Sequence, residues 1–152
     1  MKRFFSMLCT LCLMLFLIGC NLLLLDEKTA VLNGVGEYEE IVFYCTEGVQ
    51  DFTKYGKYQY SSVTLADQDK LKRMENQSDL YELMGYVDNF EQWVECSHDQ
   101  RLQSIYRFDH LIIDVGDYMY IENDPDYPAY GCYDIYFFDS ESKILYYFHN
   151  NI

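Results

Sequence analysis

The stretch YDIYFFDSESKILYYFH, residues 133–149, decides the fold. Its two ends, 133–138 and 144–149, are rich in aromatic and β-branched residues, which favour β-strands. The five residues between them, 139–143, are polar or charged and make a short connection. Two strands joined in this way predict an antiparallel hairpin close to the end of the chain.

The clearest helix precedes this hairpin, over Asp79–Glu95. Apolar residues recur there at steps of three and four, at Leu80, Leu83, Met84, Val87, Phe90 and Val94. This spacing places them on one face of an amphipathic helix. Ser78 is the expected N-cap. Gly85 inside the helix costs about 1 kcal/mol relative to alanine, and it either permits close packing or marks a break.

The remaining elements complete an α+β pattern. Strands are expected over 38–44, 57–63, 111–114 and 117–122, with a short helix over 67–74 and a loop over 123–131. The order of strands, helix and strands predicts an α+β fold. One main amphipathic helix packs on one face of a mostly antiparallel sheet, and a C-terminal β-hairpin closes it. A length of 152 residues suits a single domain, which we place at residues 37–152.

The N-terminal segment has the pattern of a signal peptide, and we do not expect it to be part of the folded domain. Lys2 and Arg3 precede an apolar run that reaches Gly19, which is the pattern of a secretory signal peptide. The run ends in Leu17-Ile18-Gly19-Cys20, which resembles the lipobox of bacterial lipoproteins. The resemblance covers residues 1–20. It implies cleavage after a signal peptide of residues 1–19, and a diacylglyceryl group on Cys20.

This resemblance implies a location as well. Residues 20–36 would be the lipidated cysteine and a tether, with the domain anchored by membrane lipid on the extracytoplasmic face of the cell membrane. The alternative is an uncleaved N-terminal transmembrane anchor, because the apolar run resumes at Leu22 and about 22 residues suffice to span a bilayer. Both interpretations place the domain outside the cytoplasm, since Lys2 and Arg3 favour a cytoplasmic N-terminus.

The charge of the chain restricts its partners. The sequence has 11 basic and 25 acidic residues, a formal net charge of −14. A nucleic-acid partner is therefore not expected, because such binders carry positive charge. Anionic wall polymers are poor partners for the same reason, and a protein or cationic partner at the cell envelope fits better.

The sequence assigns no catalytic residue, metal site or cofactor. Cys45, Cys96 and Cys132 follow the signal segment, and an odd number permits at most one disulfide between them. We expect most of these cysteines to be buried as small apolar side chains. Cys96 and His98 are only two residues apart, and chance explains this spacing better than a metal site does. Glu122, Asn123, Asp124 and Asp126 crowd one loop, with Asp114 and Asp117 just upstream, but the pattern of a calcium-binding EF-hand is absent.

Tyrosines provide the candidate binding surface. Of 16 tyrosines in the chain, several cluster between residues 118 and 136. A tyrosine offers an apolar face and a polar tip, which suits a protein interface. The candidate binding residues are Tyr118, Tyr120, Tyr127 and Tyr130. Alternate residues of a strand point to opposite faces, so not all of the clustered tyrosines share one surface, and filling a half-buried sheet is the competing explanation.

Together these observations predict a non-catalytic binding module, a membrane-anchored extracytoplasmic lipoprotein that uses an acidic, tyrosine-rich surface. The alternatives are an immunity- or inhibitor-type protein against a basic toxin or enzyme and a small hydrolase. The phrases at 51–55 and 133–138 resemble those of small bacterial lipoproteins. They match no functional motif, so this second resemblance transfers no residue.

Overall fold

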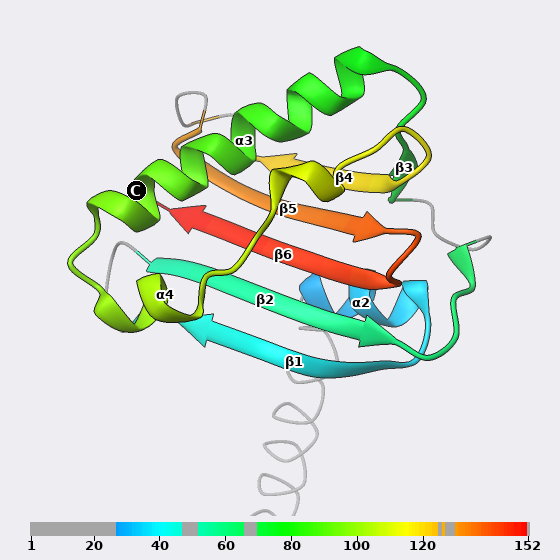
Figure 1. Ribbon diagram of the computed structural model, residues 1–152, viewed down its shortest axis with the longest axis horizontal. Coiled ribbons are helices and arrows are strands. Elements are labelled where there is room, and N and C mark those ends of the chain that lie inside the picture. The colour runs from blue at the N-terminus through cyan, green and yellow to red at the C-terminus, as the bar shows by residue number, and fades with distance from the viewer. Residues whose placement is uncertain (1–26, 47–51, 66–69, 125, 127–129, 152) are drawn as a thin grey trace, which may run out of the picture.

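The computed structural model describes residues 27–46, 52–65, 70–124, 126 and 130–151. In this part of the chain, six antiparallel strands form one sheet in the order β1-β2-β6-β5-β4-β3 (Figure 1). The strands are β1 (Tyr38–Cys45), β2 (Phe52–Tyr60), β3 (Lys72–Arg73), β4 (Tyr118–Asn123), β5 (Cys132–Asp139) and β6 (Ile144–Asn151). The predicted hairpin is confirmed, since β5 and β6 are antiparallel neighbours with Asp139 opposite Ile144.

Helix α3 (Gln77–Cys96) covers one face of the sheet, which confirms the predicted α+β class. Its N-cap is Asn76 and not the predicted Ser78. The side chain of Asn76 accepts hydrogen bonds from the backbone N–H groups of Ser78 and Asp79. Asp79 completes a capping box, because its carboxylate accepts a hydrogen bond from the backbone N–H of Asn76. The helix therefore begins two residues earlier than its apolar spacing indicated.

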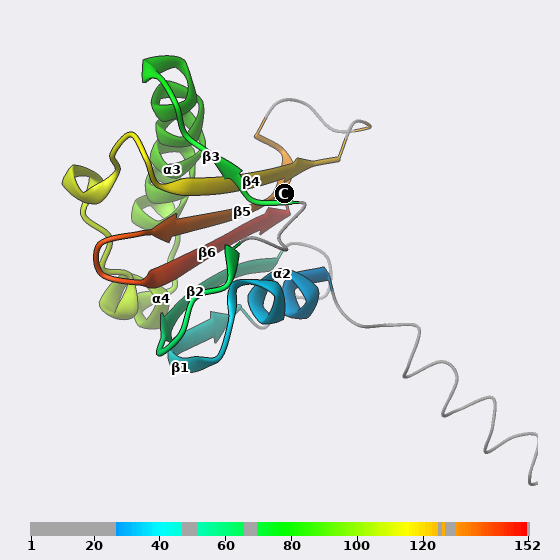
Figure 2. The same ribbon diagram turned by 90° about the vertical axis from the view of Figure 1, so that its right-hand side faces the viewer.

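Helix α2 (Glu27–Val35) covers the opposite face of the sheet, and Figure 2 shows it across the sheet from α3. The sequence predicted a tether over residues 20–36, and residues 27–35 of that segment are a helix instead. Val31, Leu32 and Val35 have at most 1% of their surface exposed. This helix docks because its apolar side chains are buried against tyrosines of the sheet. The sequence did not predict it because a nine-residue helix with three buried side chains shows no clear apolar periodicity.

The alternation of side chains along the strands builds two cores. Around α3 lie Tyr55, Met74, Leu80, Leu83, Val87, Phe90, Val94, Leu102, Tyr106, Met119, Tyr133, Ile135, Phe137, Tyr146 and Phe148. Around α2 lie Val31, Leu32, Val35, Tyr58, Tyr60, Leu71, Tyr136, Phe138, Leu145 and Tyr147. Because both faces are covered, β5 and β6 are buried almost continuously, which is why their sequences do not alternate between apolar and polar residues.

Three elements differ from their predictions. Where a strand was expected over 111–114, the chain forms a 3-10 turn, η2 (His110–Ile112), because the Asp109 side chain accepts a hydrogen bond from the Leu111 N–H. Where a helix was expected over 67–74, the described part contains β3, whose Lys72 lies opposite Met119 of β4. Strand β2 spans Phe52–Tyr60 and not residues 57–63. A short helix α4 (Gln100–Ile105) follows α3.

The cysteines and the membrane segment complete the description. Cys45, Cys96 and Cys132 are free thiols, and Cys45 and Cys96 are exposed, so the expectation of burial is wrong for these two. Among the described residues, no helix combines the length and the apolar character that crossing a bilayer requires. The predicted signal, Cys20 and the alternative anchor lie outside the described residues.

Candidate functional site

The structure divides the predicted tyrosine surface between two faces of the sheet. Tyr118 and Tyr120 lie on β4 and are partly buried against the core around α2, where Tyr120 stacks on Tyr136 at a ring distance of 5.7 Å. Tyr130 lies on the side of α3. Tyr127 is outside the described residues. The described candidates therefore do not form one surface, and Tyr118 and Tyr120 fill the half-buried sheet.

Tyr130 is the predicted residue that stays available, with 39% of its surface exposed. Its ring makes an edge-on contact with Tyr86 of α3, with 4.7 Å between the ring centroids. Its backbone φ of 69° lies in the left-handed region, which is rare for a bulky residue and is often found at functional sites. The hydroxyl reaches the backbone of Gly85, where an added Cβ would lie 3.0 Å from it. Gly85 thus permits a close approach of Tyr130 to the helix.

The neighbouring part of α3 adds exposed aromatic and acidic groups. Tyr81 lies one turn before Gly85 and has 69% of its surface exposed. Glu82 is exposed beside it, and Asn123 donates a hydrogen bond to the hydroxyl of Tyr86. We call the group Tyr81, Glu82, Gly85, Tyr86 and Tyr130 the α3 surface.

The charge of α3 has one sign. The helix contains five acidic residues and no basic one. Lys72 of β3 pairs with the first of them, Asp79. Among the described residues, no lysine or arginine ion pair reaches the four acidic residues that follow, Glu82, Asp88, Glu91 and Glu95. Lys72 also attracts Glu82 electrostatically. The outer side of α3 therefore carries an excess of negative charge next to exposed tyrosines.

A second acidic cluster on α3 includes a histidine. His110 of η2 lies between two carboxylates, with Nδ1 3.3 Å from Asp88 Oδ1 and Nε2 2.9 Å from Glu91 Oε2. Sequence reasoning missed this group because nineteen residues separate Glu91 from His110. The only local signal was the spacing of Asp88 and Glu91, which puts both carboxylates near one side of the helix.

On the sheet face that α2 covers, three polar side chains of β5 and β6 form a hydrogen-bonded cluster. His149 Nδ1 is 3.0 Å from Asp134 Oδ1, and the Tyr147 hydroxyl donates a hydrogen bond to the same carboxylate. Burial would raise the pKa of Asp134, but these hydrogen bonds outweigh it and the pKa is lowered. Burial and the nearby carboxylates of Asp124 and Asp134 raise the pKa of the Cys132 thiol. A thiol nucleophile requires the opposite shift, so this group gives no support to the hydrolase alternative.

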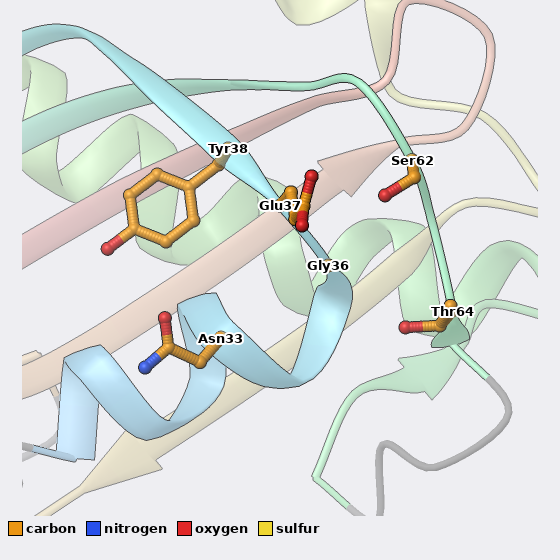
Figure 3. A pocket seen from close by; sticks show the side chains of 6 residues that line it. All are labelled: Asn33, Gly36, Glu37, Tyr38, Ser62 and Thr64. Atoms are coloured by element: carbon orange, nitrogen blue, oxygen red, sulfur yellow. The ribbon is translucent and has the colours of Figure 1, made fainter.

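A shallow pocket of about 680 Å³ opens where α2 meets β1 (Figure 3). Its walls are Asn33, Gly36, Glu37, Tyr38, Ser62 and Thr64. Gly36, with φ 149°, is required there because a Cβ would lie 2.1 Å from the Ser62 carbonyl oxygen. Glu37 is the one charged residue of the lining, so the pocket does not bring two charged groups together.

Comparisons with protein-family models, with curated proteins and with solved structures each give no match. The functional argument therefore depends on the geometry of this chain. The α3 surface differs from the predicted surface in its members, since it retains Tyr130 and gains Tyr81 and Tyr86. The helical spacing could have indicated that Tyr81 is exposed, because this residue falls outside the apolar stripe of the helix.

Proposed function

We propose that the protein is a non-catalytic binding module, held by lipid on Cys20 at the extracytoplasmic face of the cell membrane, that binds a cationic protein through the α3 surface. The observation that carries the proposal is the placement of Tyr130. An exposed tyrosine, held in a left-handed backbone conformation, packs on an acidic helix that has no basic residue.

The chemistry of the α3 surface suits a basic protein partner. Tyrosines supply rigid contact area with few rotatable bonds, and an ammonium or guanidinium group binds favourably over a tyrosine ring. Within the described residues, the chain itself shows this contact, with Arg101 Cζ 5.1 Å from the centroid of the Tyr44 ring. The negative charge of α3 adds long-range attraction, which raises the association rate more than the final affinity.

The lipid anchor rests on the sequence alone. The resemblance of residues 17–20 to a lipobox supports it, and two acyl chains are sufficient for stable anchoring. Mass spectrometry of the membrane fraction tests this part. Loss of residues 1–19 together with added acyl mass is expected, and a full-length unmodified chain in the membrane would refute it.

The binding proposal is tested by crosslinking in intact cells. A photoreactive amino acid replaces Tyr81 in one variant and the exposed Ser61, which is outside the α3 surface, in a control. We expect a crosslinked protein of basic isoelectric point from position 81 and not from position 61. The same partner from both positions, or none from position 81, would refute the use of this surface.

A matched charge change measures the electrostatic part. Glu82→Gln should weaken binding to the captured partner, and the loss should shrink at high salt because exposed charges are screened. Glu40→Gln on β1 removes the same charge from another exposed site and is the control. Equal losses in both variants would show that net charge matters and the α3 surface does not. A captured toxin or hydrolase would identify the immunity- or inhibitor-type form of the proposal.

A further inference from the structure

Three potential metal ligands converge where α3 passes η2. Asp88, Glu91 and His110 each offer one ligand atom, and these atoms lie within 4.8 Å of one another. Asp88 and Glu91 are three residues apart on the helix, and His110 faces both of them. One imidazole and two carboxylates are three of the donor groups that zinc takes in proteins.

The backbone holds these ligands in place before any ion binds. Asp88 and Glu91 belong to the middle of a twenty-residue helix with a capped N-terminus. The turn that carries His110 is capped by Asp109, and the His110 carbonyl accepts a hydrogen bond from the Ile113 N–H. The Phe108 ring contacts the imidazole edge-on, at 5.6 Å between centroids. Such restraint lowers the ordering cost of binding.

The two carboxylates are not neutralised by a lysine or arginine. Among the described residues, the ion pairs of Asp88 and Glu91 are with His110 alone. The nearby guanidinium of Arg107 instead donates hydrogen bonds to the carbonyl oxygens of Gln103 and Tyr106. The cluster therefore keeps a negative potential that attracts a cation.

A buried phenol lies beside the cluster. Tyr106 is 8% exposed, and its hydroxyl has no hydrogen-bond partner within the described part of the chain. Burial raises the pKa of Tyr106, and the negative charges of Glu91 and Asp88 raise it further. Glu91 and Tyr106 also line a pocket of about 470 Å³, which opens beside the cluster.

The donor types select the ion. Calcium and magnesium take oxygen ligands, so an imidazole between two carboxylates favours a transition-metal ion instead. Three protein ligands leave a position for water, as in open zinc sites. Asp88 lies at Nδ1 of His110 and Glu91 at Nε2. The Asp88 side chain is 55% exposed and can rotate so that both carboxylates meet an ion on one ring nitrogen, at metal–ligand distances of about 2.0–2.2 Å.

We propose that Asp88, Glu91 and His110 form a zinc-binding site on the outer side of α3. The ion would bind one ring nitrogen of His110 and one oxygen of each carboxylate, with water in the remaining position. This site is separate from the α3 surface, because neither Tyr81 nor Glu82 is one of its ligands.

Calorimetric titration of the full-length protein in detergent with zinc chloride tests the proposal. The thiols are first blocked with iodoacetamide, so that thiolates do not bind the ion. His110→Ala and Glu91→Gln each remove one ligand, and Glu91→Gln keeps the shape of the side chain. His98→Ala and Glu82→Gln are the controls, since they remove an exposed histidine and a carboxylate of the same helix outside the cluster.

We expect one saturable zinc site in the wild type and in both controls. His110→Ala and Glu91→Gln should each weaken it by at least about tenfold, the loss typical of a removed supporting contact in a metal site. A side-chain NMR spectrum should show that the His110 resonances, and not those of His98, shift with zinc. The absence of saturable binding, equal binding in all variants, or loss in His98→Ala would each overturn the proposal. None of these outcomes bears on the crosslinking at position 81.

Discussion

Replacing Leu32 by alanine tests whether α2 belongs to the domain or is a tether. Leu32 is 1% exposed and lies in the core around α2, among tyrosines of β2, β5 and β6. The Tyr60 hydroxyl donates a buried hydrogen bond of 2.9 Å to the Leu32 carbonyl, so the helix backbone is tied to the sheet at the same residue. Truncation removes apolar contacts and leaves a cavity under the helix.

The expected loss follows from these contacts. A buried leucine truncated to alanine lowers the free energy of unfolding by about 2–5 kcal/mol, depending on how far the site collapses. A domain of this size has a total stability of roughly 5–15 kcal/mol, so the loss is a large part of it. Asn33→Ala is the matched control on the same helix, because Asn33 is exposed and such changes stay within about 0.5 kcal/mol.

Urea unfolding followed by tryptophan fluorescence measures both variants. Trp93 is the one tryptophan and packs against the core around α3, on the other face of the sheet. Its signal therefore reports unfolding of the whole domain and not fraying of α2. If Leu32→Ala unfolds at the same urea concentration as Asn33→Ala, α2 is not docked and residues 27–35 act as the tether that the sequence predicted.

Three further predictions test other parts of the fold. Asn76→Ala removes the N-cap of α3 and should cost about 1 kcal/mol in urea unfolding, whereas an unchanged midpoint would refute the capping box. The pKa of Asp134 is lowered below its ordinary 3.8, because its hydrogen bond with His149 outweighs burial, which alone would raise it. The carboxylate therefore stabilises the fold above pH 3.8, and this contribution is lost as the pH falls through the lower folded-state pKa. Asp134→Asn should flatten the pH dependence of the unfolding free energy in that acidic range, and an unaltered acid transition would contradict this assignment. Iodoacetamide should label the exposed Cys45 faster than the half-buried Cys132, whose thiol pKa is raised by burial and nearby carboxylates; peptide mapping with the reverse order would argue against the packing of β5.

Local patterns were most informative where one segment forms its own element. Helix α3 was predicted within two residues at its start because three- and four-residue spacing is a property of one continuous segment. The hairpin of β5 and β6 was predicted because both strands and their connection are adjacent in sequence. The N-cap was displaced from Ser78 to Asn76 because two neighbouring polar residues are equally suitable until the backbone selects one.

The candidate site was harder to predict because its residues come from separate segments. Tyr118 and Tyr130 have the same chemistry, but their positions relative to β4 and α3 place them on opposite sides of the sheet. The sequence left open whether Gly85 permits close packing or breaks the helix, and the structure shows a close approach of Tyr130. The exposure of Cys45 follows from its position on the edge strand β1, and nothing around it in the sequence indicated that position.

The sequence by itself determined the α+β class, the main helix, the terminal hairpin and the acidic charge. Only the tertiary structure decided that α2 docks on the sheet, which tyrosines stay exposed, and that Glu91 meets His110. The physical reason is the range of the interactions. Apolar periodicity and strand propensity act between residues close in the chain, whereas burial and convergence of side chains depend on how distant segments pack.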